Sequence, residues 1–374
     1  MNVMTWQTPL FGWMMGAVGA DGDSDLVLYR EMLADAELGH RLGYDAAWLV
    51  EHHFSDYYPT PSPMVFLSHI AARCPGFGLG TAVIVTPWHH PLRIAEEIAM
   101  LSLITDGPIR IGLGRGNAPL EYEAYGVEMN EAKDRFEECW EIVQLALKAK
   151  PFTYKGKYLS VPREVVIRPT PRLEKLTFHG AIGQPSSAGK IADLGLPPML
   201  TGHTPLPAQK QVLDAWDAAA KRRGLGLDAC KLCSPIMIMA DTDREAVELA
   251  RRYVPNWYRL QVEHYAFDAE RYANLPTYLP FTETHKRRLV YCDPDALGPL
   301  LEWSFVGSAK TVRKKLEQYL DAGFNYVMVN PSLPGLPHSL RQDWLTRFGR
   351  DVMPHFAAER RPAGNGAAPR VAAQ

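Results

Sequence analysis

The stretch GLGTAVIVTPWHHPLRIAEEIAMLSLITDGPIRIGLG, residues 78–114, shows the alternation that decides the fold. Its β-branched beginning, 78–85, predicts a strand, and the segment that opens at Pro91 predicts a helix because proline is favoured in a first helical turn. The segment IRIGLG, 109–114, predicts a second strand. A strand–helix–strand unit of this kind is typical of a parallel sheet with short crossovers.

The same alternation repeats along most of the chain. We predict eight strands, at 9–15, 44–50, 78–85, 109–114, 176–182, 199–201, 232–240 and 326–330. The helices expected among them lie at 25–43, 61–73, 91–103, 131–150, 186–194, 208–223, 243–253 and 309–322. Eight units favour closure into a (β/α)8 TIM barrel over an open α/β sheet. No G-x-G-x-x-G fingerprint opens a helix after the first strand, which also argues against a dinucleotide-binding sheet.

We expect residues 1–356 to form one barrel domain with two insertions, at about 151–175 and 255–300. The first insertion alternates polar and apolar residues around Lys155-Gly156-Lys157 and predicts a hairpin. The second is rich in aromatic residues and proline with weak periodicity, so we expect it to be irregular. The small and polar residues of 357–374 predict a disordered tail.

Composition excludes several classes of function. The 374 residues carry 40 Lys+Arg against 42 Asp+Glu, and no basic cluster is available to neutralise the phosphates of a nucleic acid. No apolar stretch is long enough to cross a membrane. The N-terminus lacks a secretory signal, and five cysteines are an odd and sparse set, so we expect a cytoplasmic protein.

Histidines follow the second predicted strand, in Glu51-His52-His53-Phe54. The carboxyl ends of barrel strands carry the functional residues in this fold, and an imidazole there can move a proton near neutral pH. The alternative is a pair of loop histidines with a structural role. We expect no metal, because HExxH is absent and no third ligand stands at a suggestive spacing.

Two further strand ends are suited to an anion. Arg115 lies in a Gly-Arg-Gly turn after the fourth strand, where its guanidinium suits a phosphate. The segment 184–189 begins a helix after the fifth strand, where free amides favour an anion, although ordinary serine capping is equally compatible with it. The pair Cys230-x-x-Cys233 has redox spacing but lies at the opposite end of a strand, which favours a structural role.

Three segments resemble the bacterial-luciferase-like family of flavin-dependent monooxygenases. They are YDAAWLVEHHF (44–54), LGTAVIVTPWHHPLRIAEEIAMLSLITDGPIRIGLGRG (79–116) and VGSAKTVRKKLEQYLDAGFNYVMV (306–329), with weaker matches at RFEECWEIV (135–143), FTYKGKYL (152–159) and SSAGKIADLGLPPML (186–200). The resemblance implies a barrel that binds reduced FMN at its carboxyl mouth and works as a homodimer. A separate NAD(P)H:flavin reductase would supply the reduced flavin, and O2 would add at its C4a carbon to give a peroxide. That peroxide would oxygenate a small organic substrate by hydroxylation, Baeyer–Villiger reaction or N-oxygenation.

The resemblance also assigns residues. It implies that His52 is the acid/base near the flavin and that Ala82-Val83, a non-prolyl cis peptide in some members, lies under the flavin ring. The residues implied for the phosphate are Arg115, Lys133, Arg135, Gly183, Gln184 and Ser187. Lys133 stands where a second arginine is expected, with Arg135 two residues on. Gly114 replaces the reactive cysteine of luciferase, so long-lived light emission is not expected.

Aromatic residues at strand ends are candidates for the substrate pocket, namely Phe11, Trp13 and Trp88. The second insertion contributes Trp257, Tyr258, His264, Tyr265 and Phe267, which suit an apolar or aromatic substrate; the segment can equally be a lid or a dimer contact. Two rival functions stay open, a deazaflavin-dependent dehydrogenase and a non-catalytic flavin-binding protein.

Overall fold

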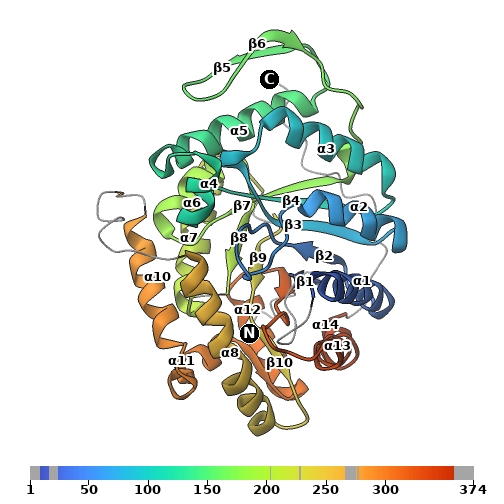
Figure 1. The fold of residues 1–374 in the computed structure, drawn as a ribbon, viewed down its shortest axis with the longest axis vertical. Helices are drawn as coiled ribbons and strands as arrows, with labels where there is room; N and C mark the ends of the chain where they lie inside the picture. The colour runs from blue at the N-terminus through green and yellow to red at the C-terminus, as the bar shows by residue number, and fades with distance from the viewer. Residues whose placement is uncertain are drawn as a thin grey trace.

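The protein forms a closed barrel of eight parallel strands surrounded by helices (Figure 1). The computed structural model describes residues 9–16, 24–202, 204–226, 229–265, 275 and 278–357. The barrel strands follow the order β1-β12-β9-β8-β7-β4-β3-β2. Their bounds are β1 (Leu10–Met15), β2 (Ala46–Leu49), β3 (Gly78–Val85), β4 (Ile109–Gly114), β7 (Leu176–Ala181), β8 (Pro198–Thr201), β9 (Leu232–Ser234) and β12 (Tyr326–Val329). The predicted (β/α)8 barrel is confirmed.

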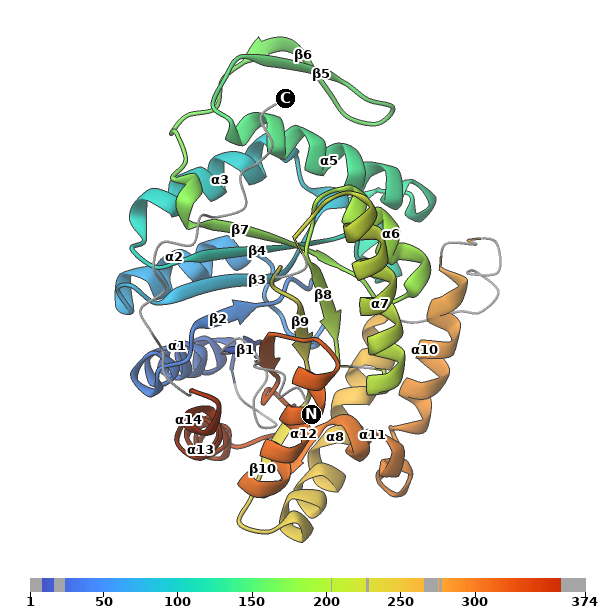
Figure 2. The same cartoon turned by 180° about the vertical axis from the view of Figure 1, so that it is seen from behind.

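Helices cover the outside of this barrel (Figure 2). Those between β1 and β8 are α1 (Asp25–Leu42), α2 (Pro63–Arg73), α3 (Pro91–Ile104), α4 (Pro119–Tyr125), α5 (Ala132–Leu147) and α6 (Pro185–Asp193). The later ones are α7 (Leu206–Arg222), α8 (Asp243–Tyr265), α10 (Leu279–Val290), α11 (Gly298–Trp303), α12 (Ala309–Asp321), α13 (His338–Arg347) and α14 (Met353–Phe356). None of the helices in these described ranges has the length and apolar character that crossing a bilayer requires.

Local sequence signals explain where the first helix begins and ends. Ser24 precedes α1 and its hydroxyl accepts a hydrogen bond from the backbone amide of Val27 at 3.4 Å. Gly43 follows α1 in the left-handed conformation, with a φ of 81°, which a residue without a Cβ adopts without strain. These caps are the reason that the predicted and observed bounds agree here.

A large side chain fills the inside of the barrel, and glycines make room for it. Trp48 on β2 is fully buried, and its indole N–H donates to the Tyr326 hydroxyl at 3.0 Å. A Cβ on Gly12 or Gly80, in the strands on either side of β2, would lie 2.7 and 2.4 Å from the Trp48 ring. The barrel is therefore a packed core below its mouth and not an open channel.

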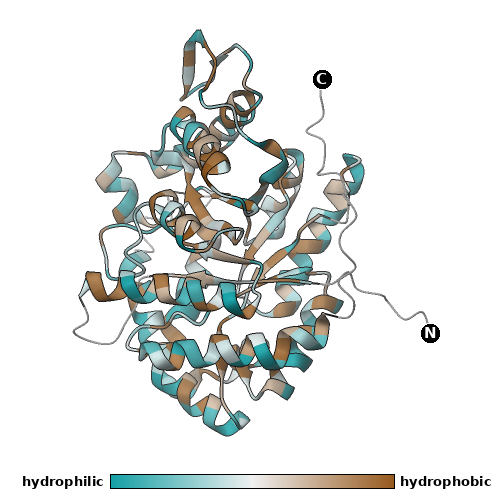
Figure 3. Cartoon of the chain, turned by 90° about the vertical axis from the view of Figure 1, so that its right-hand side faces the viewer, coloured by the Kyte–Doolittle hydropathy of each residue, from teal (hydrophilic) through white to brown (hydrophobic). Residues whose placement is uncertain are grey.

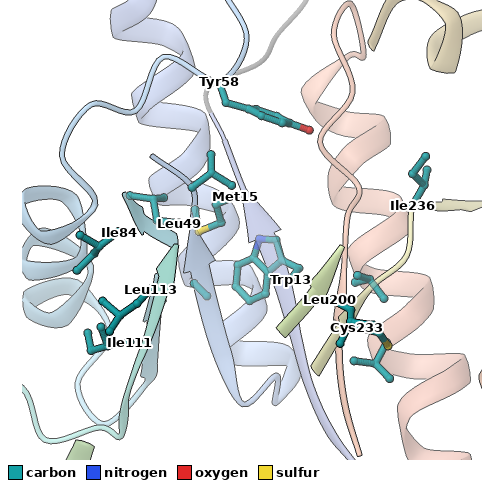
Figure 4. Packing of buried hydrophobic residues seen from close by; sticks show 14 of the residues in the cluster. Trp13, Met15, Leu49, Tyr58, Ile84, Ile111, Leu113, Leu200, Cys233 and Ile236 are labelled. Atoms are coloured by element: carbon teal, nitrogen blue, oxygen red, sulfur yellow. The ribbon is translucent and has the colours of Figure 1, made fainter. Parts of the chain in front are cut away.

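The outer face of the strands packs against the helices, and this corrects two predicted substrate residues. Phe11 and Trp13 alternate with Gly12, so they point away from the barrel interior. Trp13 packs against Phe77 and meets Gly39 of α1, while Phe11 meets Phe348 at a ring distance of 5.7 Å. Figure 4 shows Trp13 among the buried hydrophobic residues. In Figure 3 the helices carry both hydrophobic and hydrophilic residues, as expected for helices with one face against the barrel and one in solvent. The assignment of Phe11 and Trp13 to the substrate pocket is wrong.

The first insertion is the predicted hairpin, formed by β5 (Phe152–Lys155) and β6 (Ser160–Val165), which lies beside α5 at the edge of the molecule (Figure 1). Glu138 of α5 holds its turn, because the carboxylate accepts hydrogen bonds from the backbone amides of three turn residues. The predicted strand 232–240 is two strands, since β10 (Met237–Met239) leaves the barrel and pairs with β11 (Phe305–Gly307).

The described residues of the second insertion are mainly helical, contrary to the expected irregular structure. Helix α8 continues past Tyr253 and through Pro255 to Tyr265, and α10 and α11 follow it. Burial of one face, which includes Trp257 and Tyr258, outweighs the loss of one backbone hydrogen bond at the proline. Phe267 and the predicted tail beyond Ala357 lie outside the described residues.

The contact of Gly39 with Trp13 predicts a measurable effect on stability. A Cβ at Gly39 would lie 2.1 Å from the buried Trp13 ring, so Gly39→Ala should lower the free energy of unfolding by about 1–3 kcal/mol. Gly189→Ala, in α6 with no heavy atom near the added methyl, is the matched control and should raise it by about 0.5–1 kcal/mol. Urea unfolding measures both; equal behaviour of the two variants would contradict this packing.

Candidate active site

A buried carboxylate, Glu51, organises one side of the barrel mouth. It follows β2 directly and accepts hydrogen bonds from the backbone amide of Val85 at 2.9 Å and from His89 Nε2 at 2.6 Å. His53 Nε2 and Trp88 Nε1 lie 3.1 and 3.2 Å from its Oε1. Burial by itself would raise the pKa of Glu51, but these imidazoles outweigh it and the pKa is lowered. The same carboxylate raises the pKa of His89 against the opposite effect of burial.

A second buried carboxylate, Glu121 of α4, organises the other side. Its Oε1 accepts the backbone N–H of His53 at 2.8 Å and lies 3.6 Å from His52 Nδ1 and 3.4 Å from His264 Nε2. Burial would raise the pKa of Glu121, but the His264 and His52 imidazoles overcome this and lower it to about 2. Glu121 is therefore a carboxylate throughout the physiological range.

His264 is contributed by the second insertion. It lies near the end of α8, is 1% exposed, and its Nδ1 is 2.7 Å from the Ser55 hydroxyl. That contact leaves Nε2 facing Glu121. Burial lowers the pKa of His264, and the nearby Glu121 only partly offsets this, so the ring is neutral at neutral pH. The insertion thus completes the cluster at the mouth and does not merely pack beside it.

Tyrosines surround the His52 ring. The ring centroids of Tyr57, Tyr265 and Tyr58 lie 4.8, 6.1 and 6.4 Å from it. All three tyrosines are buried, and burial raises their pKa values, so the hydroxyls stay protonated. Trp257 Nε1 donates to the Tyr58 hydroxyl at 2.8 Å, which ties α8 to the loop after β2. His52 is therefore held in a largely apolar environment with one carboxylate beside it.

His52, Glu121 and His264 each direct one donor atom to a common point. These atoms all lie within 4.8 Å of one another, a set of two imidazoles and a carboxylate that suits a transition metal as well as a shared proton. The absence of a metal from this site, expected from the sequence, stays a prediction.

The residues implied for the flavin ring meet at the ends of β3 and β4. The Ala82–Val83 peptide bond is cis, as the resemblance implied. A Cβ on Gly114 would lie 2.6 Å from the Val83 side chain, so the glycine leaves room for that valine. Both Ala82 and Val83 pack against the interior cluster that contains Trp48.

The residues implied for the phosphate follow neighbouring strands, since β4 pairs with β7. Gly183 and Gln184 lie just before α6, and Ser187 lies in its first turn. Gln184 is the N-cap, and no side chain caps the helix, so the serine-capping alternative is wrong. Arg115 follows β4, and its guanidinium lies 4.8 Å from the centroid of the Tyr278 ring.

The two cations on α5 that were predicted to contact the phosphate are placed less favourably for that contact than Arg115. Lys133 is exposed, while Arg135 donates to Glu131 at 2.8 Å and lies over the Tyr158 ring. Lys190 of α6 pairs with Glu137 at 2.8 Å, so α5 and α6 lie side by side. Of the three substrate candidates at predicted strand ends, Trp88 alone lies at the mouth, where it packs on Tyr125 at 5.4 Å.

Sequence reasoning missed the roles of Glu121 and Glu51. Glu121 lies in a short helix that the periodicity does not reveal, and only its position soon after a strand end could have indicated it. Glu51 stood beside His52 in the quoted motif but was not assigned a role. Cys230 and Cys233 carry free thiols, and the structural interpretation of this motif stays a prediction.

Comparison with known sequences identifies relatives over most of the chain. The family model described as luciferase-like monooxygenase matches residues 10–326. The chain is 29% identical over 325 residues to the uncharacterized protein y4wF of Sinorhizobium fredii, covering 85% of the chain and 89% of that protein. It is 34% identical over 153 residues to y4vJ of the same organism, covering 40% and 44%. The alkanal monooxygenase alpha chain of Aliivibrio fischeri is 23% identical over 219 residues, covering 58% and 62%, so the last two alignments span less than two thirds of those relatives.

Solved structures share the fold. Monooxygenase RslO1 of Streptomyces bottropensis has a TM-score of 0.78 at 23% identity, covering 93% of this chain and 100% of that one. The oxygenating constituent of 3,6-diketocamphane monooxygenase of Pseudomonas putida, in complex with FMN, has 0.74 at 20%, covering 93% and 99%. An F420-dependent secondary alcohol dehydrogenase has 0.71 at 16%, covering 92% and 98%.

The lowered pKa of Glu121 predicts how stability depends on pH. The ionised carboxylate stabilises the fold above about pH 4.5, and this contribution is lost as the pH falls toward 2, for a total of about 3 kcal/mol. In Glu121→Gln the free energy of unfolding should therefore fall less steeply over that range than in the wild type. Glu128→Gln, exposed shortly after the same helix, is the control and should follow the wild type. Urea unfolding at a series of pH values measures this, and identical slopes for Glu121→Gln and the wild type would rule out the effect.

Proposed function

Because the chain belongs to the luciferase-like monooxygenase family, whose members are oxidoreductases, we propose that it is a flavin-dependent monooxygenase. It would use externally supplied reduced FMN and O2 to oxygenate a small organic substrate. The observation that carries the proposal is the cluster of the partly buried His52 with the buried Glu121 and His264 at the carboxyl mouth of the barrel. Family relatives named as alkanal monooxygenases and a fold neighbour solved with FMN support the choice of cofactor.

The residues at the mouth fit a flavin phosphate. The first-turn amides of α6 have no capping side chain, which leaves them available to an anion, and Ser187 adds a hydroxyl. Arg115 lies at the end of the neighbouring strand β4 and supplies the positive charge. Reduced flavin, when bound, would supply the electrons that activate O2.

His52 is placed to hold and move a proton. The Glu121 carboxylate lies 3.6 Å from Nδ1 of His52, on the side of the ring where a proton on that nitrogen would face it. The His264 ring lies 4.8 Å from the His52 ring. Because the pKa of His264 is lowered, its ring adds no positive charge beside His52 at neutral pH. The tyrosine rings around His52 leave its side chain 17% exposed, which limits its contact with water.

We further propose that a separate NAD(P)H:flavin reductase delivers the reduced flavin and that the chain acts as a homodimer in the cytoplasm. These proposals rest on the family membership. A deazaflavin-dependent dehydrogenase is the second candidate. An F420-dependent secondary alcohol dehydrogenase shares the fold. In addition, the F420-dependent glucose-6-phosphate dehydrogenase of Amycolatopsis mediterranei is 25% identical to the chain over 346 residues.

The two candidates differ in what they bind and consume. We expect the protein to bind reduced FMN under anaerobic conditions more tightly than reduced F420, with anaerobic titration calorimetry as the readout. When a flavin reductase, NADH, FMN and 18O2 are supplied, we expect a small organic substrate to be oxygenated. One 18O atom should then appear in the product. Tight binding of F420 with substrate oxidation in the absence of O2 would establish the second candidate instead.

The role of His52 predicts a kinetic effect. His52→Ala should reduce product formation by about 10²–10⁴-fold, because a positioned proton-transfer group contributes that much, while reduced FMN binding changes little. His90→Asn is the control, since His90 lies nearby at the N-terminus of α3, is exposed, and accepts a hydrogen bond from Leu92 that asparagine can replace. Single-turnover product formation gives the rate, and wild-type turnover in His52→Ala would remove His52 from the mechanism.

A further inference from the structure

Helix α10 buries a positive charge for which the described residues provide no carboxylate. Arg288 is 4% exposed, its Nε donates to Gln261 Oε1 at 3.1 Å, and its Cζ lies 4.1 Å over the Tyr265 ring. No acidic side chain in the described part of the chain lies within ion-pair distance of it. Burial lowers the pKa of Arg288, which shows that the folded protein bears a cost for this charge.

Another buried arginine shows how the same fold normally compensates such a charge. Arg341 is 2% exposed and donates to Asp35 at 2.6 Å and to Glu31 at 2.9 Å. Lys231, 7% exposed, pairs with Asp217 at 2.6 Å. A buried guanidinium without a carboxylate among the described residues is costly, so the bound anion that would offset this cost has a site here.

The polar groups around Arg288 are donors without acceptors. Arg288 Nη1, Gln261 Nε2 and the Tyr258 hydroxyl are buried and have no hydrogen-bond partner. Gln261 Oε1 is already used by Arg288, so the amide presents only its NH2 group. Burial raises the pKa of Tyr258, so its hydroxyl remains a proton donor. A guanidinium, an amide NH2 and a hydroxyl are the chemistry of an oxyanion site.

This donor set lies next to the candidate active site. The Tyr265 ring separates the two, since its centroid is 6.1 Å from the His52 ring and 4.1 Å from Arg288 Cζ. Tyr57 lines the same side, 4.8 Å from His52 and 5.8 Å from Tyr265. A molecule held by its charged end at Arg288 would direct the remainder of its structure along these rings toward His52.

We propose that Arg288, with Gln261 and Tyr258, binds the carboxylate of an aromatic substrate. This rests on the proposed function in taking the barrel mouth as the place of reaction. The site has one buried cation, so a monoanion is neutralised, whereas a phosphate dianion would leave one negative charge uncompensated in a buried environment. The tyrosine rings favour an aromatic body over an aliphatic one.

The test uses two aromatic probes of nearly the same shape, one with an anionic carboxylate and one with a neutral amide. Benzoate and its neutral counterpart benzamide are titrated into the full chain without flavin, with calorimetry as the readout. We expect benzoate to bind at least tenfold more tightly. Arg288→Met should weaken benzoate binding by about 10–100-fold and leave benzamide unchanged, because hydrogen bonds to a charged group contribute about 1.5–3 kcal/mol. Arg252→Met, which removes an exposed arginine lying over Tyr253, is the matched control and should change neither.

Stability separates a binding arginine from a structural one. Because Arg288→Met removes an unpaired buried charge, its Tm should equal or exceed that of the wild type, and Arg288→Lys should keep part of the preference for benzoate. Equal binding of benzoate and benzamide, a lowered Tm of Arg288→Met, or tighter binding of phenyl phosphate than of benzoate would each overturn the proposal. Since no flavin is present, a selective benzoate site in a protein that fails to bind reduced FMN would contradict the proposed function alone.

Discussion

The burial of charge at the barrel mouth is the constraint on which the site depends. A carboxylate removed from water must be compensated by donors, and Glu51 and Glu121 each collect several. His53 joins the two networks, because its ring contacts Glu51 and its backbone N–H donates to Glu121. His52 stands between Glu51 and His53 in the chain, so the contacts of these two neighbours fix its position. Arg288 obeys the same constraint, and we infer that its compensation comes from the substrate.

The barrel topology brings these groups together. Parallel strands place all their carboxyl ends at one rim, so Glu51 after β2, Val85 at the end of β3 and Arg115 after β4 meet there although they are far apart in sequence. Helix α8 then lies against this rim and adds His264. The second insertion thus links the cluster of His52 and Glu121 to the donors around Arg288, and under the two proposals above this one segment would serve both proton transfer and substrate binding.

Sequence patterns predicted the elements well where local signals are strong. The bounds of β3 and β4 agree with prediction because β-branched runs are closed by turn residues, and α1 begins and ends at its caps. Prediction failed where burial decides. Phe11 and Trp13 lie within β1, before its carboxyl end, and the pleat turns both toward the helices. The segment after Tyr253 lacks clear periodicity, but packing of Trp257 and Tyr258 keeps it helical.

The sequence by itself determined the eight-unit barrel, the family and the candidate His52, because these follow from local periodicity and from ordered motifs. It did not determine what surrounds His52. Glu121, 69 residues later, and His264, farther still, reach the same point only after the chain closes on itself. The pKa values at the site, and the unpaired state of Arg288, depend on distances and burial across the barrel. Such quantities arise from the tertiary structure, since desolvation and charge interactions act through space and not along the chain.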